Sequence, residues 1–203
     1  MGELIDNYFQ NHLSMSKEDA NYLHHHYYRE YGLAIEGLVR FQKVDPLEYN
    51  EKVDDALPLD DIIKPDPKLK QLLQRIDRSK VKVWLFTNAY ITHGKRVVRL
   101  LDVEDQFDGL TYCDYGGWPL LCKPAKEMFE KAMRESGATD VNQCYYVDDS
   151  GINARGGKDF GWTTAHLVEP IDDSEAPTVL VAHFQIESLY ELPDIFPELF
   201  KPV

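Results

Sequence analysis

Hydrophobic residues recur at three- and four-residue spacing through the first sixty or so positions of the chain. This spacing places them along one face of a helix, so it predicts a run of helices. The expected helices cover Gly2–Leu13, the stretch from Ser16 to Gly32, Leu33–Phe41, and the stretch from Asp45 to about Leu57. Ser16 and Asp45 are suited to cap a helix start, and Gly32 is suited to a left-handed helix end.

Beyond Ile63, short apolar runs alternate with helical stretches. The expected strands are Val81–Phe86, Leu110–Cys113, Gln143–Val147, Thr163–Leu167 and Thr178–Phe184, of which the first is expected to be buried. The expected helices are Asp66 to about Asp77, Thr92–Leu101, Pro124–Ser136, Gly151–Phe160 and a tail to Phe200. This alternation predicts βαβ units and a parallel sheet. We therefore expect an α/β protein with a helical module over 1–63 and an α/β core over 64–203.

Charge and composition exclude several classes of protein. The 203 residues include 35 acidic and 22 basic side chains, a net charge of −13, which disfavours binding to nucleic acid polymers or anionic membranes. No apolar stretch approaches the roughly 20 residues that span a bilayer, and no secretory signal is visible at the start. Three cysteines without a Cys-x-x-Cys pair indicate a reduced setting, so we expect a cytoplasmic protein, with a nuclear location also open.

Polar side chains follow two of the expected strands, at the strand ends where open parallel sheets bind ligands. Thr87 and Asn88 end the first strand and form either a neutral anion-binding corner or an ordinary turn. Asp148 and Asp149 end the third strand. This pair suits Mg²⁺, which takes one or two carboxylates plus water and phosphate oxygens; alternatively, Asp149 and Ser150 only cap the next helix.

Lys123 and Pro124 stand at an expected helix start between those two segments. A lysine beside a helix N-terminus offers positive charge to a phosphate, although most lysines are simply solvated. In an acidic chain, such a local charge is what an anionic ligand requires.

These three features occur in the order strand–Thr-Asn, Lys-Pro at a helix start, and strand–Asp-Asp-Ser-Gly. The sequence thereby resembles the haloacid dehalogenase superfamily from Pro65 to about Leu167. Five stretches resemble its pyrimidine 5′-nucleotidase branch: Tyr27–Leu33, Val53–Pro58, Trp84–Tyr90, Phe107–Tyr115 and Tyr146–Gly151.

The resemblance implies a haloacid dehalogenase-like Rossmannoid parallel sheet, a helical cap over residues 1–63, and hydrolysis of nucleoside monophosphates through an aspartyl-phosphate. It implies that Thr87 binds the transferring phosphoryl group, that Asn88 lies beside it, and that Lys123 neutralises the phosphate. The partner would be a small pyrimidine nucleoside 5′-monophosphate.

The resemblance also implies a metal site and a base-binding surface. Asp148 and Asp149 would hold Mg²⁺, directly or through waters, and Asn153 would support their loop. The aromatic residues Tyr27, Tyr28 and Tyr31 of the helical module are candidates for stacking on the nucleobase, although core packing is the alternative for each.

One element of the family pattern is absent from the sequence. The family requires Asp-x-Asp-x-Thr at the end of a strand before the cap, and none of the acid pairs here has that spacing. The nucleophile and the first core strand, which lies between the strands ending at Thr87 and Asp148, are therefore expected on roughly 20–40 further N-terminal residues. Two other hypotheses remain open: an inactive protein that binds nucleotide or phosphate, and a phosphatase, phosphomutase or dehalogenase acting on another small molecule.

Overall fold

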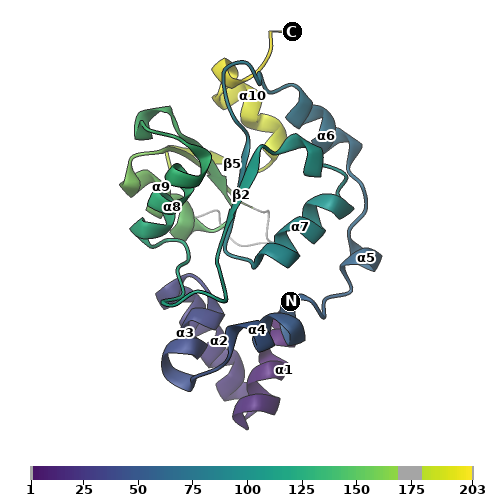
Figure 1. Cartoon of the computed structure of the whole chain (residues 1–203), viewed down its shortest axis with the longest axis vertical. Coiled ribbons are helices and arrows are strands. Elements are labelled where there is room, and N and C mark those ends of the chain that lie inside the picture. Colours follow the sequence, from purple (N-terminus) through teal and green to yellow (C-terminus); the bar gives the residue numbers. More distant parts are fainter. Residues whose placement is uncertain (1, 169–179, 203) are drawn as a thin grey trace. The chain divides into compact units, whose positions relative to one another are not determined.

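The computed structural model describes residues 2–168 and 180–202. Three of the predicted N-terminal helices are confirmed as α1 (Gly2–Leu13), α2 (Lys17–Tyr31) and α3 (Ala34–Gln42) (Figure 1). The Ser16 side chain accepts a hydrogen bond from the Asp19 backbone N–H at 3.1 Å and caps α2. At the other end of α2, Gly32 adopts a left-handed conformation with φ of 76°, as its sequence position predicts.

The predicted fourth helix is shorter than its hydrophobic pattern suggests. It begins as α4 (Pro46–Tyr49), continues as a π-helix over Asn50–Asp54, and is followed by α5 (Leu59–Ile62). The Asp55 backbone N–H donates to the Asn50 carbonyl at 2.8 Å, the wider spacing of a π-helix, and the chain then turns away from the helix axis. Single π-helical turns are frequent at functional sites, and this one holds the buried Asp54 described below.

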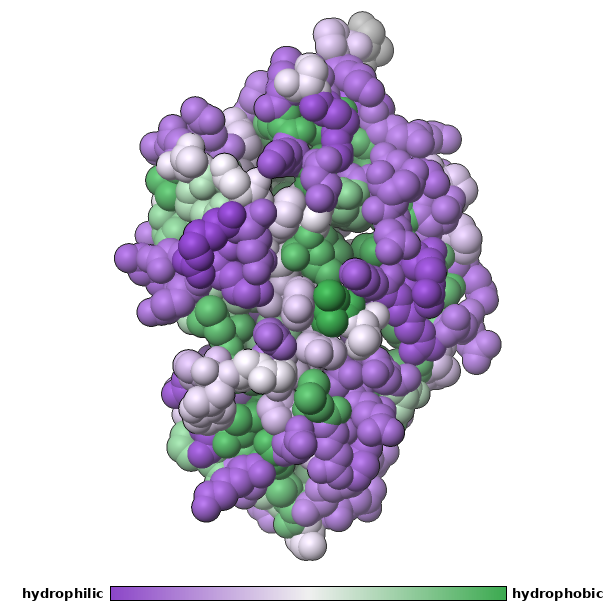
Figure 2. Space-filling model, viewed as in Figure 1, coloured by the Kyte–Doolittle hydropathy of each residue, from purple (hydrophilic) through white to green (hydrophobic). Residues whose placement is uncertain are grey.

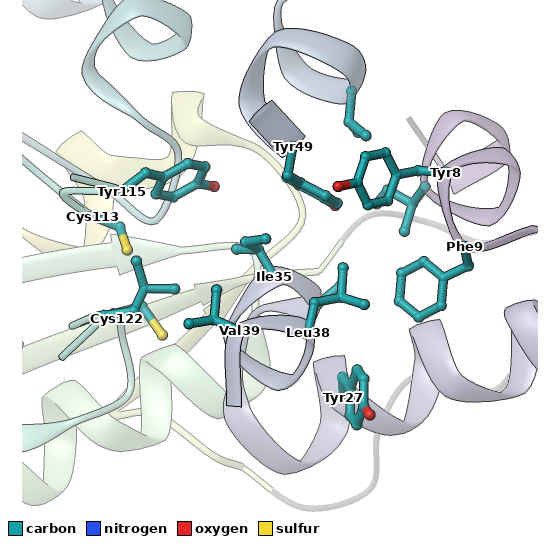
Figure 3. Packing of buried hydrophobic residues seen from close by; sticks show 14 of the residues in the cluster. Tyr8, Phe9, Tyr27, Ile35, Leu38, Val39, Tyr49, Cys113, Tyr115 and Cys122 are labelled. Carbon is teal, nitrogen blue, oxygen red and sulfur yellow. The ribbon is translucent and has the colours of Figure 1, made fainter. Parts of the chain in front are cut away.

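The hydrophobic core of the helical module also contains residues of the later segment 113–122. Figure 3 shows Ile35 and Val39 of α3 packed toward Cys113 and Cys122, which belong with them to one buried cluster. Burial raises the pKa of the Cys122 thiol to about 12, which fits a packing role and not that of a nucleophile.

A second link joins the end of the helical module to α7 (Ile91–Leu100). The Arg96 guanidinium donates to the backbone carbonyls of Asp55 and Leu57, at 3.3 and 3.1 Å, and pairs with the Asp60 carboxylate. The segment after the π-helix is therefore fixed to α7 by both backbone and side-chain contacts.

The strands form two sheets. One contains β1 (Trp84–Thr87) and β2 (Gly109–Tyr112), and the other has the order β3 (Tyr145–Asp148), β4 (Thr163–Leu167) and β5 (Phe184–Ile186). The second sheet is parallel, as predicted, with Asp148 of β3 opposite His166 of β4. Among the described residues, no strand pairs with both β1 and β3.

Two strand predictions need correction. Strand β1 is half-buried throughout instead of fully buried, and β2 is its strand partner in the sheet. The last strand begins at Phe184, where it was expected to end; residues 178 and 179 of that prediction lie outside the described residues. Its position is set by pairing with β4, Leu167 opposite Ile186, and not by its own apolar pattern.

Helices α6 (Pro67–Gln74), α8 (Lys126–Ser136) and α9 (Gly151–Phe160) are close to those predicted. The predicted helical tail to Phe200 is limited to the four-residue α10 (Leu192–Ile195), with a 3-10 turn on either side. Helix α9 packs on β3 and β4 and also contacts α8.

The chain divides into two compact units. The first consists of the chain up to Pro65, Phe86–Glu104 and Tyr112–Lys123; the second consists of Asp66–Leu85, Asp105–Thr111 and the chain from Pro124 onward. The predicted cap over 1–63 lies within the first unit, whereas the predicted core over 64–203 contributes to both. The division into cap and core at residue 63 stays a prediction.

Hydrophilic residues cover much of the face shown in Figure 2, and hydrophobic ones are visible in separate areas between them. Among the helices of the described residues, none combines the length and the apolar character that crossing a bilayer requires.

Candidate active site

The polar corner at the end of β1 is built by residues far apart in the sequence. The Asn88 side-chain amide donates to the Lys123 carbonyl at 3.0 Å, and the Asn88 Oδ1 accepts from the Lys123 backbone N–H at 2.7 Å. The neighbouring Thr87 Oγ1 accepts from the Ala89 backbone N–H at 3.0 Å and forms a local turn. Asn88 therefore does more than lie beside Thr87: it fixes the backbone of the lysine predicted to bind phosphate.

The Lys123 side chain is only 4% exposed. Its ammonium donates to the Phe86 carbonyl at 3.0 Å and lies 4.8 Å from the centre of the Phe86 ring. Lys123 precedes α8 by three residues, so it does not stand at the helix start where it was predicted. A buried ammonium at a strand end is nevertheless suited to bind an anion, because low-dielectric surroundings strengthen its attraction.

The acid pair lies at the end of β3. Asp148 is 9% exposed and accepts hydrogen bonds from neighbours in its own unit. Its Oδ1 accepts from the Ser150 backbone N–H at 2.8 Å and from the Asn153 amide at 3.2 Å, and its Oδ2 accepts from the Tyr146 hydroxyl. Burial, followed by the nearby Asp148 carboxylate, raises the pKa of Tyr146 well above its usual value, so this hydroxyl keeps its proton and acts as the donor. Asp149 is exposed, and its carbonyl contacts His166 Nε2 at 3.2 Å.

The donor set of this pair fits Mg²⁺. Each carboxylate oxygen has two lone pairs, so a carboxylate that accepts hydrogen bonds is also able to ligate a cation, and Asp149 faces solvent. Within the described part of the chain, no group of three or more His, Cys, Asp or Glu side chains is arranged to hold a metal ion. Two carboxylates are sufficient for Mg²⁺, because it keeps several waters and uses substrate oxygens as ligands.

A second buried carboxylate was missed by the sequence analysis. Asp54 is 5% exposed, and the Tyr115 hydroxyl contacts both its Oδ2, at 3.4 Å, and the Asn88 carbonyl, at 3.5 Å. Burial raises the pKa of Asp54, an effect that the nearby His93 opposes. Two buried atoms here, Asn50 Oδ1 and His93 Nδ1, have no hydrogen-bond partner among the residues that the structure describes. The sequence places Asp54 only within a stretch that resembles the nucleotidases, and no local pattern indicates its burial.

The three tyrosines of α2 differ in their surroundings. Tyr27 is buried, and its ring lies so close to Gly37 that a Cβ there would be 2.1 Å from it. This corrects the prediction for Tyr27, because a core residue offers no open face to a nucleobase. Tyr31 is half-buried with the Arg40 guanidinium 5.1 Å from its ring centre, and Tyr28 is 41% exposed. For Tyr28 and Tyr31, base stacking stays a prediction.

A surface hollow in the second unit contains none of the predicted residues. Its volume is about 640 Å³, and Lys126, Ile152 and Arg155 are among the residues that line it. It is open to solvent, and its charged side chains lie at the surface, so we assign it no ligand.

The structure brings the predicted residues together in two groups. Thr87, Asn88 and Lys123 meet in the first unit, and Asp148, Asp149 and Asn153 meet in the second. That the two groups face one phosphate stays a prediction from the family resemblance.

Comparison with known proteins agrees with the motif series. Residues 4–161 match the family described as haloacid dehalogenase-like hydrolase. The chain is 37% identical over 182 residues to "Phosphate metabolism protein 8" of Saccharomyces cerevisiae, covering 85% of this chain and 56% of that protein. It is 28% identical over 156 residues to "Pyrimidine 5'-nucleotidase YjjG" of Escherichia coli, covering 73% of this chain and 63% of that protein.

A similar fold occurs in the crystal structure of the HAD phosphatase from Thermococcus onnurineus. The TM-score is 0.61 at 17% identity, over 96% of this chain and 87% of that one. This likeness shows a shared α/β architecture with helices and parallel strands. The chain spans little more than half the length of the yeast and bacterial relatives, so it corresponds to a part of each.

Proposed function

The chain belongs to the haloacid dehalogenase-like hydrolase family. We propose that it provides the phosphate-binding and metal-binding groups of a Mg²⁺-dependent phosphomonoesterase that hydrolyses pyrimidine nucleoside 5′-monophosphates. The observation that carries the proposal is the buried Lys123, held by Asn88 at the end of β1. The similarity to a bacterial pyrimidine 5′-nucleotidase supports the substrate class. We further propose that the protein acts in the cytoplasm, alone or also in the nucleus.

Each residue of the first group has a role in this proposal. The Lys123 ammonium compensates the charge of the phosphate, and the Thr87 hydroxyl is a donor for a phosphoryl oxygen. Asn88 keeps the Lys123 backbone in place through its two hydrogen bonds, so the ammonium is positioned before the substrate arrives. Preorganised charge of this kind stabilises a transition state without reorganisation during the reaction.

The second group would hold the cation. Asp148 and Asp149 supply the carboxylates, and Asn153 orients Asp148 through its amide. When bound, Mg²⁺ supplies positive charge to the phosphoryl oxygens, which this acidic chain needs in addition to Lys123.

The proposal leaves the nucleophile outside these 203 residues. The sequence contains no Asp-x-Asp-x-Thr, and the one acid pair at a strand end is already placed at the metal. This same observation favours a second candidate function, the binding of a nucleotide or phosphate without turnover.

Phosphate release separates the two candidates. We would compare the 203-residue chain with a form that carries an N-terminal extension containing Asp-x-Asp-x-Thr, and measure phosphate released from UMP and CMP with Mg²⁺. We expect release from the extended form alone, and Lys123→Met in that form should lower the rate by orders of magnitude.

Each other outcome has a distinct meaning. Release by the 203-residue chain would show that its nucleophile has been overlooked. An extended form that binds UMP but releases no phosphate would favour the binding function. Asp149→Asn should weaken the Mg²⁺ dependence of the extended form; an unchanged metal midpoint would show that Asp149 does not hold the metal.

A further inference from the structure

Tyr146 and Asp148 lie on the same face of β3. Side chains alternate along a strand, so residues two apart project together, and here both are buried, Tyr146 at 6% exposure and Asp148 at 9%. The Tyr146 hydroxyl donates a hydrogen bond to Asp148 Oδ2. The strand itself therefore brings a phenol donor to a carboxylate of the candidate metal pair.

The ring of Tyr146 is fixed on several sides. Phe129 of α8 and Trp162 contact it edge to face, with ring centres 5.9 and 5.6 Å away. Gly157 of α9 lies against the ring so closely that a Cβ there would be 2.6 Å from Tyr146 Cδ1. The position of the Tyr146 hydroxyl is consequently set by residues of α8, of α9 and of the segment between α9 and β4.

Asp148 is oriented by neutral donors of its own unit. Its Oδ1 is occupied by the Ser150 N–H and the Asn153 amide, whereas the Tyr146 hydroxyl holds Oδ2. Neutral donors fix the plane of a carboxylate without themselves neutralising its charge. Outer partners of this kind tune the affinity of many metal sites.

We propose that Tyr146 is a positioning residue whose hydroxyl holds the Asp148 carboxylate in the orientation in which the Asp148–Asp149 pair binds a divalent cation. This inference rests on the proposed function, because it takes the pair as the metal site. The competing explanation is structural: a buried hydroxyl needs a partner, and Asp148 is the nearest acceptor. Only the first explanation connects Tyr146 to metal affinity.

The test measures cation binding directly. Mn²⁺ binds to the same oxygen donors as Mg²⁺, and the free ion is quantified by its electron paramagnetic resonance signal. We expect Tyr146→Phe to weaken Mn²⁺ binding by about tenfold, the lower end of the effect of losing an outer partner. Tyr145→Phe is the matched control. Tyr145 lies on the same strand but on its opposite face, and its hydroxyl is hydrogen-bonded to Glu198. It should leave Mn²⁺ affinity unchanged.

Asp149→Asn separates failure of the inference from failure of the proposed function. If Asp149→Asn loses Mn²⁺ binding while Tyr146→Phe binds as tightly as the native chain, the metal site stands and the positioning role is wrong. If Asp149→Asn binds Mn²⁺ normally, the assignment of the metal site is wrong, and the positioning role proposed for Tyr146 is then wrong as well.

A second measurement covers the case in which Tyr146→Phe fails to fold. Replacing Tyr146 by 3-fluorotyrosine keeps the ring and the hydroxyl, and its ¹⁹F resonance reports on the hydrogen bond to Asp148. We expect Mg²⁺ to shift this resonance and to leave that of a label at position 145 in place. A chain that binds Mg²⁺ without moving the resonance at 146 would overturn the proposal.

Discussion

Lys123 and Asp148 are both buried charges near strand ends, and each is oriented by neutral groups of its own unit. They differ in where those groups lie in the sequence. Asn88 and the Phe86 carbonyl, which bind Lys123, are 35 and 37 positions away from it. Tyr146, Ser150 and Asn153, which donate to Asp148, lie within five positions of it.

This difference separates two ways of building a charged site. A strand, a turn and the first turn of α9 are sufficient to place all three donors around Asp148. The corner at Lys123 requires two distant segments to meet, so it depends on the packing of the whole first unit. We therefore expect changes at the Lys123 corner to affect folding more than changes around Asp148.

The largest expected effect is that of Asn88→Ala. The change removes two hydrogen bonds and leaves the backbone N–H and carbonyl of the buried Lys123 without their amide partner. We expect the free energy of unfolding to fall by about 2–3 kcal/mol, measured by urea denaturation. Asn142→Ala is the control, because that exposed amide donates a local hydrogen bond to Asp140, two positions away, and the change should cost no more than about 0.5 kcal/mol. Equal losses in the two variants would contradict the view that non-local bonds hold this corner.

A smaller loss is expected for Asp148→Asn in metal-free buffer. The variant keeps one acceptor oxygen but loses the charge that strengthens the three hydrogen bonds. We expect a loss of about 1–2 kcal/mol in the free energy of unfolding. Asp149→Asn, the neighbouring exposed acid, should change stability by less than about 0.5 kcal/mol. If both variants were equally stable, the donors around Asp148 would contribute little to the fold.

The same contrast explains how much of the site could be predicted. The Asp148 group lies in one strand–turn–helix segment, and α9 and β4 begin and end where the sequence analysis placed them. The acid pair was identified from this local pattern, and Asn153 from the family resemblance. The hydroxyl of Tyr146 was not assigned a role, because its partner follows from strand alternation and burial together.

Non-local contacts account for what the sequence did not reveal. The double hydrogen bond between Asn88 and Lys123 has no local signature, and Lys123 was wrongly placed at a helix start. The strand at Phe184–Ile186 takes its register from β4, which apolar patterning cannot show. For Tyr27 the sequence left base stacking and core packing both open, and the absence of a side chain at Gly37 makes room for its ring in the core.

Asp54 completes the comparison, because it is a buried carboxylate with fewer donors than Asp148. Its contact with the Tyr115 hydroxyl is long, at 3.4 Å, and burial raises its pKa, with Asp55 adding to this and His93 and Tyr115 opposing it. A raised pKa in the folded state means that Asp54 favours folding fully only below its ordinary value of 3.8. That contribution is lost as the pH rises through the folded-state pKa.

Asp54→Asn should therefore make the protein more stable at pH 7, which is the opposite sign to Asp148→Asn. We expect the gain in thermal midpoint to be the smallest of the three effects and to shrink as the pH falls toward 4, where the native carboxyl also becomes neutral. Asp61→Asn is the control, because that exposed carboxylate is not among the groups that shift the pKa of Asp54, and it should give no such pH-dependent gain. A loss of stability for Asp54→Asn at pH 7 would show that the charge of Asp54 is held by its neighbours as firmly as that of Asp148.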